Sequence, residues 1–337
     1  MATQSVPKVI LNDGLQIPAL GFGTSGVQLA DQKNEAEAAY QAIRCAINCG
    51  YRFFDTAALY MNESSVGRAI NDAIKEGQVT RDELVVCTKV WNTAHKRESV
   101  MRACRDSLAR LQLDYVDIYL IHWPMAYAEI SQQPLDFDTI NPKDASTNKL
   151  LYSDTHFLET WLGMEDTKEA GLVRSIGLSN FNHLMIDQIL AMPGLRFKPS
   201  LLQVELHPYL SQAKLHKYCT SHGIILNAYC PLGAPGAEWT ANQPKVIEDA
   251  LIKEIAQRHQ RSPAQIILRY HIERSIVPIP KSSTPARIRE NFDVFDFSLS
   301  PTEMQQLLAL DRGLRYCLNT AGEYPTDHPL YPFHAEY

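Results

Sequence analysis

Short apolar stretches alternate with amphipathic segments along most of the 337-residue chain. Near its start, Asn12, Asp13 and Gly14 separate two apolar segments, and this predicts a β-hairpin because these residue types tolerate positive φ. Later apolar runs such as VDIYLI and ELVVCT are typical of strands buried on both faces of a parallel sheet. The predicted strands span residues 19–21, 53–55, 84–88, 116–121, 175–177, 202–204, 224–227 and 276–279.

Helical periodicity falls between these strands. Several of the predicted helices end beside a glycine, such as Gly50 or Gly171, where a C-cap is expected. The predicted helices span residues 34–48, 63–76, 97–111, 155–170, 186–191, 212–221, 246–259 and 263–273. Eight strand–helix units without a linker-like break predict an α/β fold, a (β/α)8 TIM barrel, formed by one domain over residues 1–337.

A doubly wound sheet is the alternative fold, because Gly21, Gly23 and Gly26 match the GxGxxG dinucleotide fingerprint. In that fingerprint the glycines open a helix directly, whereas the helical pattern here begins only near Asn34. The next strand-end acid, Asp55, also comes later than the usual spacing of about 20 residues. We therefore interpret these glycines as a loop at the mouth of a barrel.

Two segments exceed the usual length of a connection. One spans residues 125–153 and the other residues 233–245, and such segments in compact domains are usually functional loops. We expect both at the C-terminal face of the barrel. The proline-containing tail, residues 311–337, is expected to fold over one end of the barrel.

Composition narrows the class of protein. The net charge of −6 argues against a nucleic-acid surface, and no apolar run approaches the ~20 residues that cross a bilayer. The start, MATQSVPKV, lacks the pattern of a signal peptide. The seven cysteines form no CxxC pair, which favours free thiols in a reducing compartment. We expect a soluble cytoplasmic protein without nucleic-acid or membrane partners.

Four polar residues follow three successive predicted strands. Asp55 and Tyr60 come after the second strand, Lys89 ends the third, and His122 follows the fourth. Barrel enzymes carry their reacting groups at these C-terminal strand ends. Each residue alone has an ordinary structural role, but their convergence on one mouth predicts an active site.

The chemistry of this set suits hydride addition to a carbonyl group. A free tyrosine, with a pKa near ~10, is a weak acid at neutral pH, and the Lys89 ammonium is expected to lower the pKa of Tyr60. Asp55 would pair with Lys89, and His122 would donate a hydrogen bond to the carbonyl oxygen. Nothing indicates covalent catalysis, since the chain has no GxSxG elbow and no cysteine in a nucleophile motif.

Seven segments resemble, in order and spacing, those of the aldo-keto reductases. They are GYRFFDTAALYMNE, VVCTKVWNTAH, YLIHWP, GLSNF, LLQVELHPYL, NAYCPLG and VPIPKSSTPARIRENF. The similarity reaches from the N-terminal hairpin to the terminal YPFHAEY and looks closest to the aldose reductase and aldehyde reductase branch. The resemblance implies a catalytic tetrad of Asp55, Tyr60, Lys89 and His122, with Tyr60 as the general acid in reduction.

The resemblance also implies a site for NADPH or NADP+. Ser179, Asn180 and Gln203 match residues that hold the nicotinamide carboxamide, and Tyr229 matches the ring stacked under the nicotinamide. The other implied cofactor contacts are Thr24, Asp55, Leu232, Lys281, Ser282, Ser283, Arg287, Glu290 and Asn291. Within that set, residues 281–283 and 287 match the pocket for the adenosine 2′-phosphate, and residues 290–291 lie near the adenine.

The residues themselves leave two explanations for the cations after the last strand. Lys281, Arg287 and Arg289 suit either an exposed helix face or a phosphate site. A 2′-phosphate needs cations, whereas a free ribose hydroxyl would need an acidic partner. Together with the resemblance, this favours NADPH over NADH.

The implied substrate pocket is aromatic. Trp91, Trp123 and Trp239 match its lining, beside Tyr60 and His122, so we expect a substrate with an apolar or aromatic body. The chain departs from the family at two places. Ser25 stands where the family usually has an aromatic residue, which is expected to widen the pocket. Cys230 replaces a serine common after the stacking tyrosine, which removes one hydrogen-bond donor to the cofactor phosphates.

The sequence thus predicts a monomeric NADP(H)-dependent oxidoreductase that reduces aldehydes and ketones to alcohols. The alternatives are a prostaglandin- or steroid-type ketone reductase of the same fold and a non-catalytic NADPH-binding accessory protein. A metal-dependent barrel hydrolase would need more strand-end ligands than Asp55 and His122, so no metal site is predicted.

Overall fold

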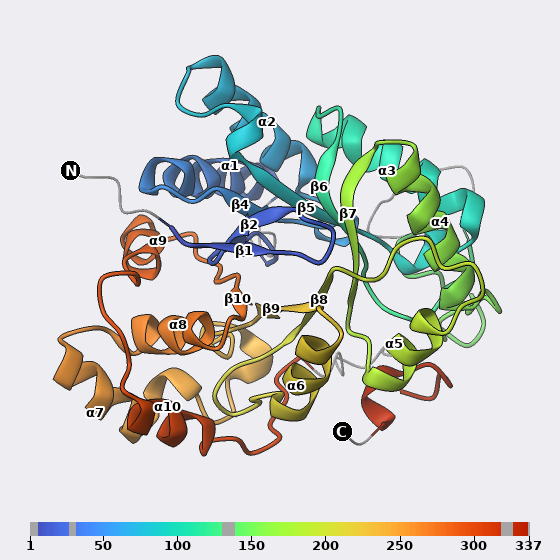
Figure 1. Cartoon of the computed structure of the whole chain (residues 1–337). Coiled ribbons are helices and arrows are strands. Elements are labelled where there is room, and N and C mark those ends of the chain that lie inside the picture. Colours follow the sequence, from blue (N-terminus) through green and yellow to red (C-terminus); the bar gives the residue numbers. More distant parts are fainter. Residues whose placement is uncertain (1–5, 27–31, 130–138, 318–325, 336–337) are drawn as a thin grey trace.

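Eight parallel strands form a ring in the computed structural model. The structure describes residues 6–26, 32–129, 139–317 and 326–335, and for residues 32–35 and 239 it describes the backbone only. The strands, each bonded to the next, are β3 (Phe22–Gly23), β4 (Phe53–Asp55), β5 (Val85–Val90), β6 (Val116–Ile121), β7 (Val173–Ser179), β8 (Leu201–Glu205), β9 (Ile225–Tyr229) and β10 (Val277–Pro278). The ring closes because the Gly21 and Gly23 amides donate to the carbonyls of Pro278 and Pro280, at 3.0 and 3.1 Å. The predicted barrel is confirmed (Figure 1).

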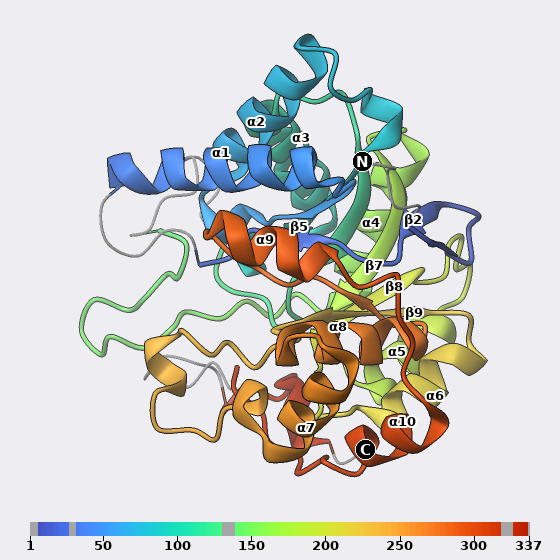
Figure 2. The same cartoon turned by 90° about the vertical axis from the view of Figure 1, so that its left-hand side faces the viewer.

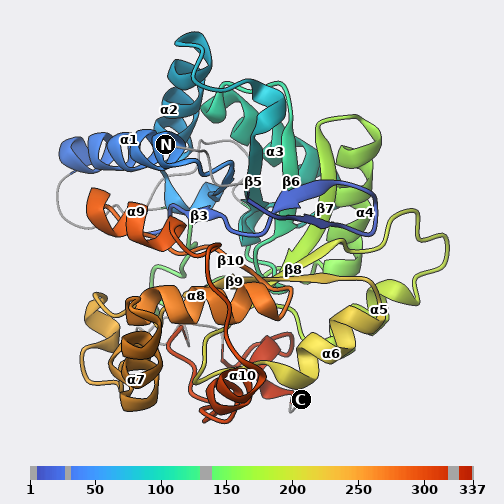
Figure 3. The ribbon, with the colours of Figure 1, turned by 60° about the vertical axis from the view of Figure 1, so that its left-hand side comes forward.

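Helices surround the strands (Figures 1 and 3). They are α1 (Gln32–Cys49), α2 (Glu63–Lys75), α3 (Arg97–Leu111), α4 (Phe157–Glu169), α5 (His183–Leu190), α6 (Ala213–Ser221), α7 (Ala250–His259), α8 (Pro263–Glu273), α9 (Pro285–Phe292) and α10 (Pro301–Leu308). A continuous apolar core lies between their inner faces and the strands. In the described ranges, no helix is long and apolar enough to span a membrane.

The predicted hairpin covers the end of the barrel where the strands begin. Its strands, β1 (Lys8–Ile10) and β2 (Gln16–Pro18), pair antiparallel, and Gly14 takes a φ of +90° in the turn. Leu15 and Ile17 pack against Phe53 and other side chains inside the barrel. The hairpin therefore plugs this end and leaves the other end for chemistry.

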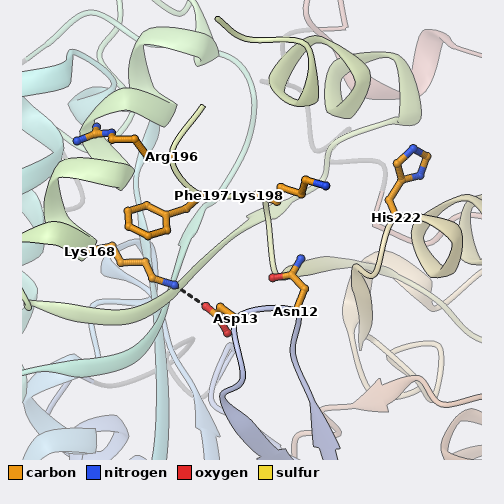
Figure 4. A pocket seen from close by; sticks show the side chains of 7 residues that line it. All are labelled: Asn12, Asp13, Lys168, Arg196, Phe197, Lys198 and His222. Carbon is orange, nitrogen blue, oxygen red and sulfur yellow. Dashed lines mark hydrogen bonds and ion pairs between the residues drawn. The ribbon is translucent and has the colours of Figure 1, made fainter. Parts of the chain in front are cut away.

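A polar pocket beside the hairpin turn shows how the plug is anchored (Figure 4). The Asp13 carboxylate accepts hydrogen bonds from Lys168 and from the Ser175 hydroxyl, while the Asn12 amide donates to the carbonyl of Pro199. Arg196, on the pocket wall, is already paired with carboxylates of α4. These contacts attach the turn to the outside of the barrel.

The first barrel strand differs from the prediction. Residues 19–21 were expected as a strand, but the hydrogen-bonded strand is β3, whose Phe22 and Gly23 align with Phe54 and Asp55. A side chain at Gly23 would place its Cβ 2.8 Å from the carbonyl oxygen of Ile279. Gly21 and Gly23 of the GxGxxG match therefore allow the barrel to close, and the doubly wound alternative is wrong.

One helical prediction also needs correction, and two further helices were missed. The stretch expected as one helix over 246–259 is a 3-10 turn (Val246–Glu248) followed by α7, because Asp249 caps α7 by accepting from the amides of Leu251 and Ile252. Helices α9 and α10 were not predicted. Both are only eight residues long, and both begin with proline, the residue that normally signals a break.

The long segment after β6 lies at the end of the barrel opposite the hairpin (Figure 2). Part of it, residues 130–138, is outside the described residues. The described parts pair through Tyr127 with Tyr152 and Lys143 with Leu150. The end of the tail, near Tyr331 and Phe333, packs on the same mouth, as the sequence predicted for the tail.

Candidate active site

A buried ion pair lies at the mouth of the barrel. Asp55 is the last residue of β4, and Lys89 lies on the neighbouring β5, two positions beyond the partner of Asp55 in the strand register. The Lys89 ammonium donates to both carboxylate oxygens of Asp55, at 2.9 and 2.8 Å. Both side chains are buried, Lys89 completely. Such a pair is retained only when its charges compensate each other, so each residue fixes the other.

Tyr60 completes this group from a 3-10 turn after β4 (Ala58–Tyr60). Its hydroxyl lies 3.2 Å from the Lys89 nitrogen, which also donates to the Thr56 carbonyl at 2.9 Å. An ammonium has donors but no acceptor, so the Tyr60 oxygen must accept from Lys89. The hydroxyl hydrogen of Tyr60 is therefore left for another acceptor.

The pKa of Tyr60 does not follow the prediction. Burial raises the pKa of Tyr60 to about 12, and the Lys89 ammonium opposes this rise without overcoming it. For Lys89 itself, burial would lower the pKa, but Asp55 and Tyr60 together raise it above its ordinary value. The direction of the effect of Lys89 was correct, but the net shift was predicted wrongly because the sequence does not reveal how deeply the phenol is buried.

His122 lies directly after β6, beside Tyr60. Their ring centroids are 5.7 Å apart, and the Trp91 ring lies 5.2 Å from His122 on another side. Burial, and then the charge of Lys89, hold the pKa of His122 well below its ordinary value. His122 is therefore neutral at physiological pH and carries one N–H donor. Its Nδ1 atom is buried and has no hydrogen-bond partner among the described residues.

Gln203 and Asn227 extend the group across the barrel interior. The Gln203 amide nitrogen donates to Asp55 Oδ1 at 2.7 Å and to Asn227 Oδ1 at 2.6 Å. Asn227 in turn donates to the Val277 carbonyl at 2.7 Å. Asn227 was not among the predicted site residues. A polar residue inside the otherwise apolar strand β9 is the signal that could have revealed it, and in the structure Asn227 pairs directly with Gln203 of β8.

The other residues expected near the nicotinamide also meet at this mouth. Asn180 donates to the main-chain carbonyl of His122 at 3.0 Å and accepts from the Tyr229 hydroxyl at 2.8 Å. Ser179 lies 3.2 Å from the Asn180 amide. Thr24, on the loop after β3, donates to the Asp55 carbonyl at 2.9 Å. Together with the residues described above, these side chains come from seven neighbouring strands, β3 to β9, and meet at one mouth.

The residues expected at the adenosine phosphate lie at the end of β10 and in α9. Lys281 donates to the Gly26 carbonyl at 3.1 Å, and the Ser282 hydroxyl accepts from the Thr284 amide. Lys281 and Arg287 are exposed, and no ion pair among the described residues uses either. Unpaired cations with nearby hydroxyls suit a dianionic phosphate. Ser283 is exposed on the same loop, Glu290 and Asn291 follow in α9, and Leu232 lies three residues after Tyr229.

An aromatic cluster forms the outer wall of the mouth. Trp91 and Trp123 are 3% and 6% exposed, and they pack with Tyr127, Tyr331 and partly buried Phe333. The side chain of Trp239 lies outside the described part of the structure. Tyr127, Tyr331 and Phe333 were not predicted, because they lie in the long loop and the tail, where periodicity gives no signal.

The barrel and the acid–base groups at its mouth define a TIM-barrel enzyme. A family model described as "Aldo/keto reductase family" matches residues 19–312, and the chain belongs to this family. Similar proteins include "Aldo-keto reductase family 1 member D1" of Mus musculus (41% identity over 332 residues), "Aldo-keto reductase family 1 member A1" of Sus scrofa (42% over 337) and "Prostaglandin F synthase 1" of Bos taurus (43% over 332). Each alignment covers 98% of both chains. The chain is accordingly an oxidoreductase of carbonyl compounds.

Proposed function

We propose that the protein reduces aldehydes and ketones to alcohols with NADPH, and that Tyr60 donates the proton. One observation carries this proposal: Lys89 occupies the acceptor side of the Tyr60 hydroxyl at 3.2 Å, which leaves the hydroxyl hydrogen for a carbonyl oxygen in the mouth. The neutral His122 beside it can donate a second hydrogen bond to the same oxygen.

The raised pKa of Tyr60 has a consequence for the direction of the reaction. A phenol whose pKa lies at about 12 remains protonated at neutral pH and is ready to give a proton. Oxidation of an alcohol would need the phenolate, which burial disfavours. The protonated phenol is the form of Tyr60 that the proposed reduction needs.

The donor set fits NADPH. The carboxamide of the nicotinamide would contact Ser179, Asn180 and Gln203, and Tyr229 would stack on the ring. When bound, the reduced cofactor supplies the hydride. Lys281 and Arg287, which lack acidic partners in the described ranges, would hold the 2′-phosphate, with Ser282, Ser283, Glu290 and Asn291 around the adenosine and Leu232 on the loop beside the pyrophosphate. This is the basis for NADPH rather than NADH.

The substrate is proposed to have an apolar or aromatic body. The cluster formed by Trp91, Trp123, Tyr127 and Tyr331 offers apolar surface beside His122. Ser25 is exposed and small, so this position contributes no aromatic surface to the side of the mouth next to the glycine loop. A bulky carbonyl compound would be accommodated there better than in a site with an aromatic residue at that position.

A prostaglandin- or steroid-type ketone is the second candidate substrate. It is favoured by the similarity to the bovine protein named "Prostaglandin F synthase 1" together with the small Ser25.

We also propose that the protein is cytoplasmic and monomeric and that residues 1–337 form a single domain. The support for the compartment is that all seven cysteines are free thiols.

The test is to offer the protein a panel of aromatic aldehydes and bulky ketones and to measure their reduction as the loss of NADPH absorbance. Tyr60→Phe is expected to lower the rate of reduction by about 10²–10⁴-fold, the usual contribution of a general acid, while NADPH still binds. Tyr115→Phe, at the hairpin end of the barrel, is the matched control and should be fully active. Wild-type protein that binds NADPH but reduces no carbonyl would instead support a non-catalytic binding role.

A further inference from the structure

Cys230 and Cys317 lie side by side although they are 87 positions apart. Their sulfur atoms are 3.2 Å apart, and both residues are half-buried. Cys230 directly follows Tyr229 at the end of β9, and Cys317 belongs to the segment after α10. The sequence suggested scattered thiols, and the fold brings these two together.

Both thiols are held in place by surrounding contacts. The carboxylate of Glu205, fully buried at the end of β8, accepts from the main-chain amides of Tyr316 and Cys317, at 2.6 and 2.8 Å. The carbonyl of Cys230 accepts from the Gly233 amide at 2.9 Å, which fixes the turn after β9. The two sulfur atoms therefore face each other because their backbones are anchored.

We propose that Cys230 and Cys317 form a reversible disulfide, a modification site beside the proposed cofactor site. The sulfur atoms need to approach by about 1 Å to reach the S–S bond length of ~2.05 Å. With a peroxide as the oxidant, one thiolate attacks the peroxide oxygen and becomes a sulfenic acid, and hydroxide leaves. The second thiol then attacks that sulfur, the S–S bond forms and water leaves. Overall, two thiols lose two electrons and two protons, and the peroxide is reduced to water.

The surroundings indicate which sulfur reacts first. The hydrogen bond with Cys230, followed by burial and the nearby Glu205, raises the pKa of Cys317 well above its ordinary value. Only thiolates attack oxidants readily. The buried Glu205 carboxylate, which accepts from the Cys317 amide at 2.8 Å, also disfavours a second negative charge on Cys317, so we assign Cys230 to the first oxidation and Cys317 as the resolving thiol.

The bridge would also restrain the proposed cofactor site, an effect that rests on the proposed function. Cys230 has a φ of +45° and links Tyr229, whose hydroxyl donates to Asn180, to the loop that begins at Pro231. A covalent link to Cys317 would tie the start of this loop to the segment held by Glu205. If that loop closes over the cofactor, the bridged protein exchanges NADPH more slowly.

The first experiment measures the bridge without any cofactor. Full-length protein is treated with hydrogen peroxide, and its thiols are counted after denaturation; a fall from seven to five is expected. A tryptic digest without reductant should join the peptide of residues 218–245 to that of residues 316–337. Dithiothreitol should restore all seven thiols. A thiol count that stays at seven, or a bridge between Cys45 and Cys49, would overturn the proposal.

Single variants assign the sulfur atoms. Cys230→Ser should abolish the cross-link, which also excludes Cys219, the other cysteine of the first peptide. Cys317→Ser should leave Cys230 as a sulfenic acid that a dimedone reagent captures, whereas Cys230→Ser should give much less labelling of Cys317. Equal labelling in the two variants would contradict the order of attack. Cys45→Ser, in α1, is the control and should retain the cross-link.

A second experiment tests the consequence for the cofactor. The release rate of NADPH is compared between the oxidised and reduced forms of wild-type protein, and the same comparison is made for Cys317→Ser. A several-fold slower release is expected only for oxidised wild-type protein. Equal rates would refute the restraint while leaving the bridge established. Protein that forms the bridge but binds no NADPH would count against the proposed function alone.

Discussion

The side-chain amide of Gln203 is held in one orientation by Asn227. Asn227 donates to the fixed carbonyl of Val277, so its own oxygen must face Gln203, which donates to it at 2.6 Å. The same Gln203 nitrogen donates to Asp55 at 2.7 Å. With acceptors on these two sides, the Gln203 carbonyl oxygen is the atom left to accept a hydrogen bond from a bound carboxamide.

Asn227→Leu should therefore weaken cofactor binding without touching the cofactor. Gln203 would lose one of its two acceptors and could rotate, and the Val277 carbonyl would lose its partner, at a cost of about 1–3 kcal/mol in stability. We expect the dissociation constant for NADP+ to rise about tenfold, equivalent to ~1.4 kcal/mol. Quenching of tryptophan fluorescence measures this directly. Asn12→Leu removes a similar amide at the hairpin end and should leave affinity unchanged.

Lys89→Met should destabilise the protein as well as inactivate it. The variant leaves the Asp55 carboxylate buried without its counter-charge, which typically costs about 3–5 kcal/mol. The free energy of unfolding in urea should fall by that amount. Adding Asp55→Asn should recover part of the loss, because the uncompensated charge is then removed. A Lys89→Met variant as stable as the wild type would mean that the pair contributes little.

The architecture could be predicted because parallel strands buried on both faces are continuously apolar. The bounds of β4, β6, α3 and α8 match the prediction, and the hairpin was expected from its turn residues. The errors fall where tertiary contacts, rather than the local sequence, determine the secondary structure. The strand β3 is only two residues long and is defined by pairing with β4, and α9 follows a proline that the sequence presents as a break.

The site could be predicted in part because strand ends converge in any parallel barrel. Asp55, Lys89 and His122 were therefore placed together from the sequence. Asn227 was missed because its one local signal, a polar residue inside an apolar strand, does not show that its side chain faces the barrel interior beside Gln203. The pKa of Tyr60 was predicted wrongly because burial depends on the loop and tail residues that cover the mouth.

His95 should make the protein less stable in mild acid. Both of its ring nitrogens are buried and have no hydrogen-bond partner in the described part of the chain. Burial, followed by the charge of His328, lowers the pKa of His95 to about 3. The unfolded chain takes up this proton near pH 6.5, but the folded chain does so only near pH 3. The stabilisation is thus complete above pH 6.5 and is lost as the pH falls towards 3, by up to about 1.4 kcal/mol per pH unit.

His95→Leu should accordingly flatten the acid side of the stability profile. Urea unfolding measured from pH 7.5 down to about pH 4 should show a smaller loss of free energy than in the wild type, by the contribution of one proton. Burial also lowers the pKa values of His122 and His271, so these two residues should account for part of the pH dependence that remains in the variant. The exposed His222, replaced by Gln, serves as the control. An unchanged slope in His95→Leu would show that His95 titrates normally in the folded protein.

Lys281→Met should change the choice between the two nicotinamide cofactors. Lys281 lies at the end of β10 without an acidic partner in the described ranges, so a dianionic 2′-phosphate would be its natural counter-charge. Loss of a charge-assisted hydrogen bond typically costs about 1.5–3 kcal/mol, so the dissociation constant for NADPH should rise roughly 10- to 150-fold. Affinity for NADH, which lacks this phosphate, should change little. Lys198→Met, an exposed lysine beside the hairpin pocket of Figure 4, controls for net charge and should affect neither cofactor. Equal losses for NADPH and NADH in Lys281→Met would place the phosphate elsewhere, and Arg287→Met would then be the variant to compare.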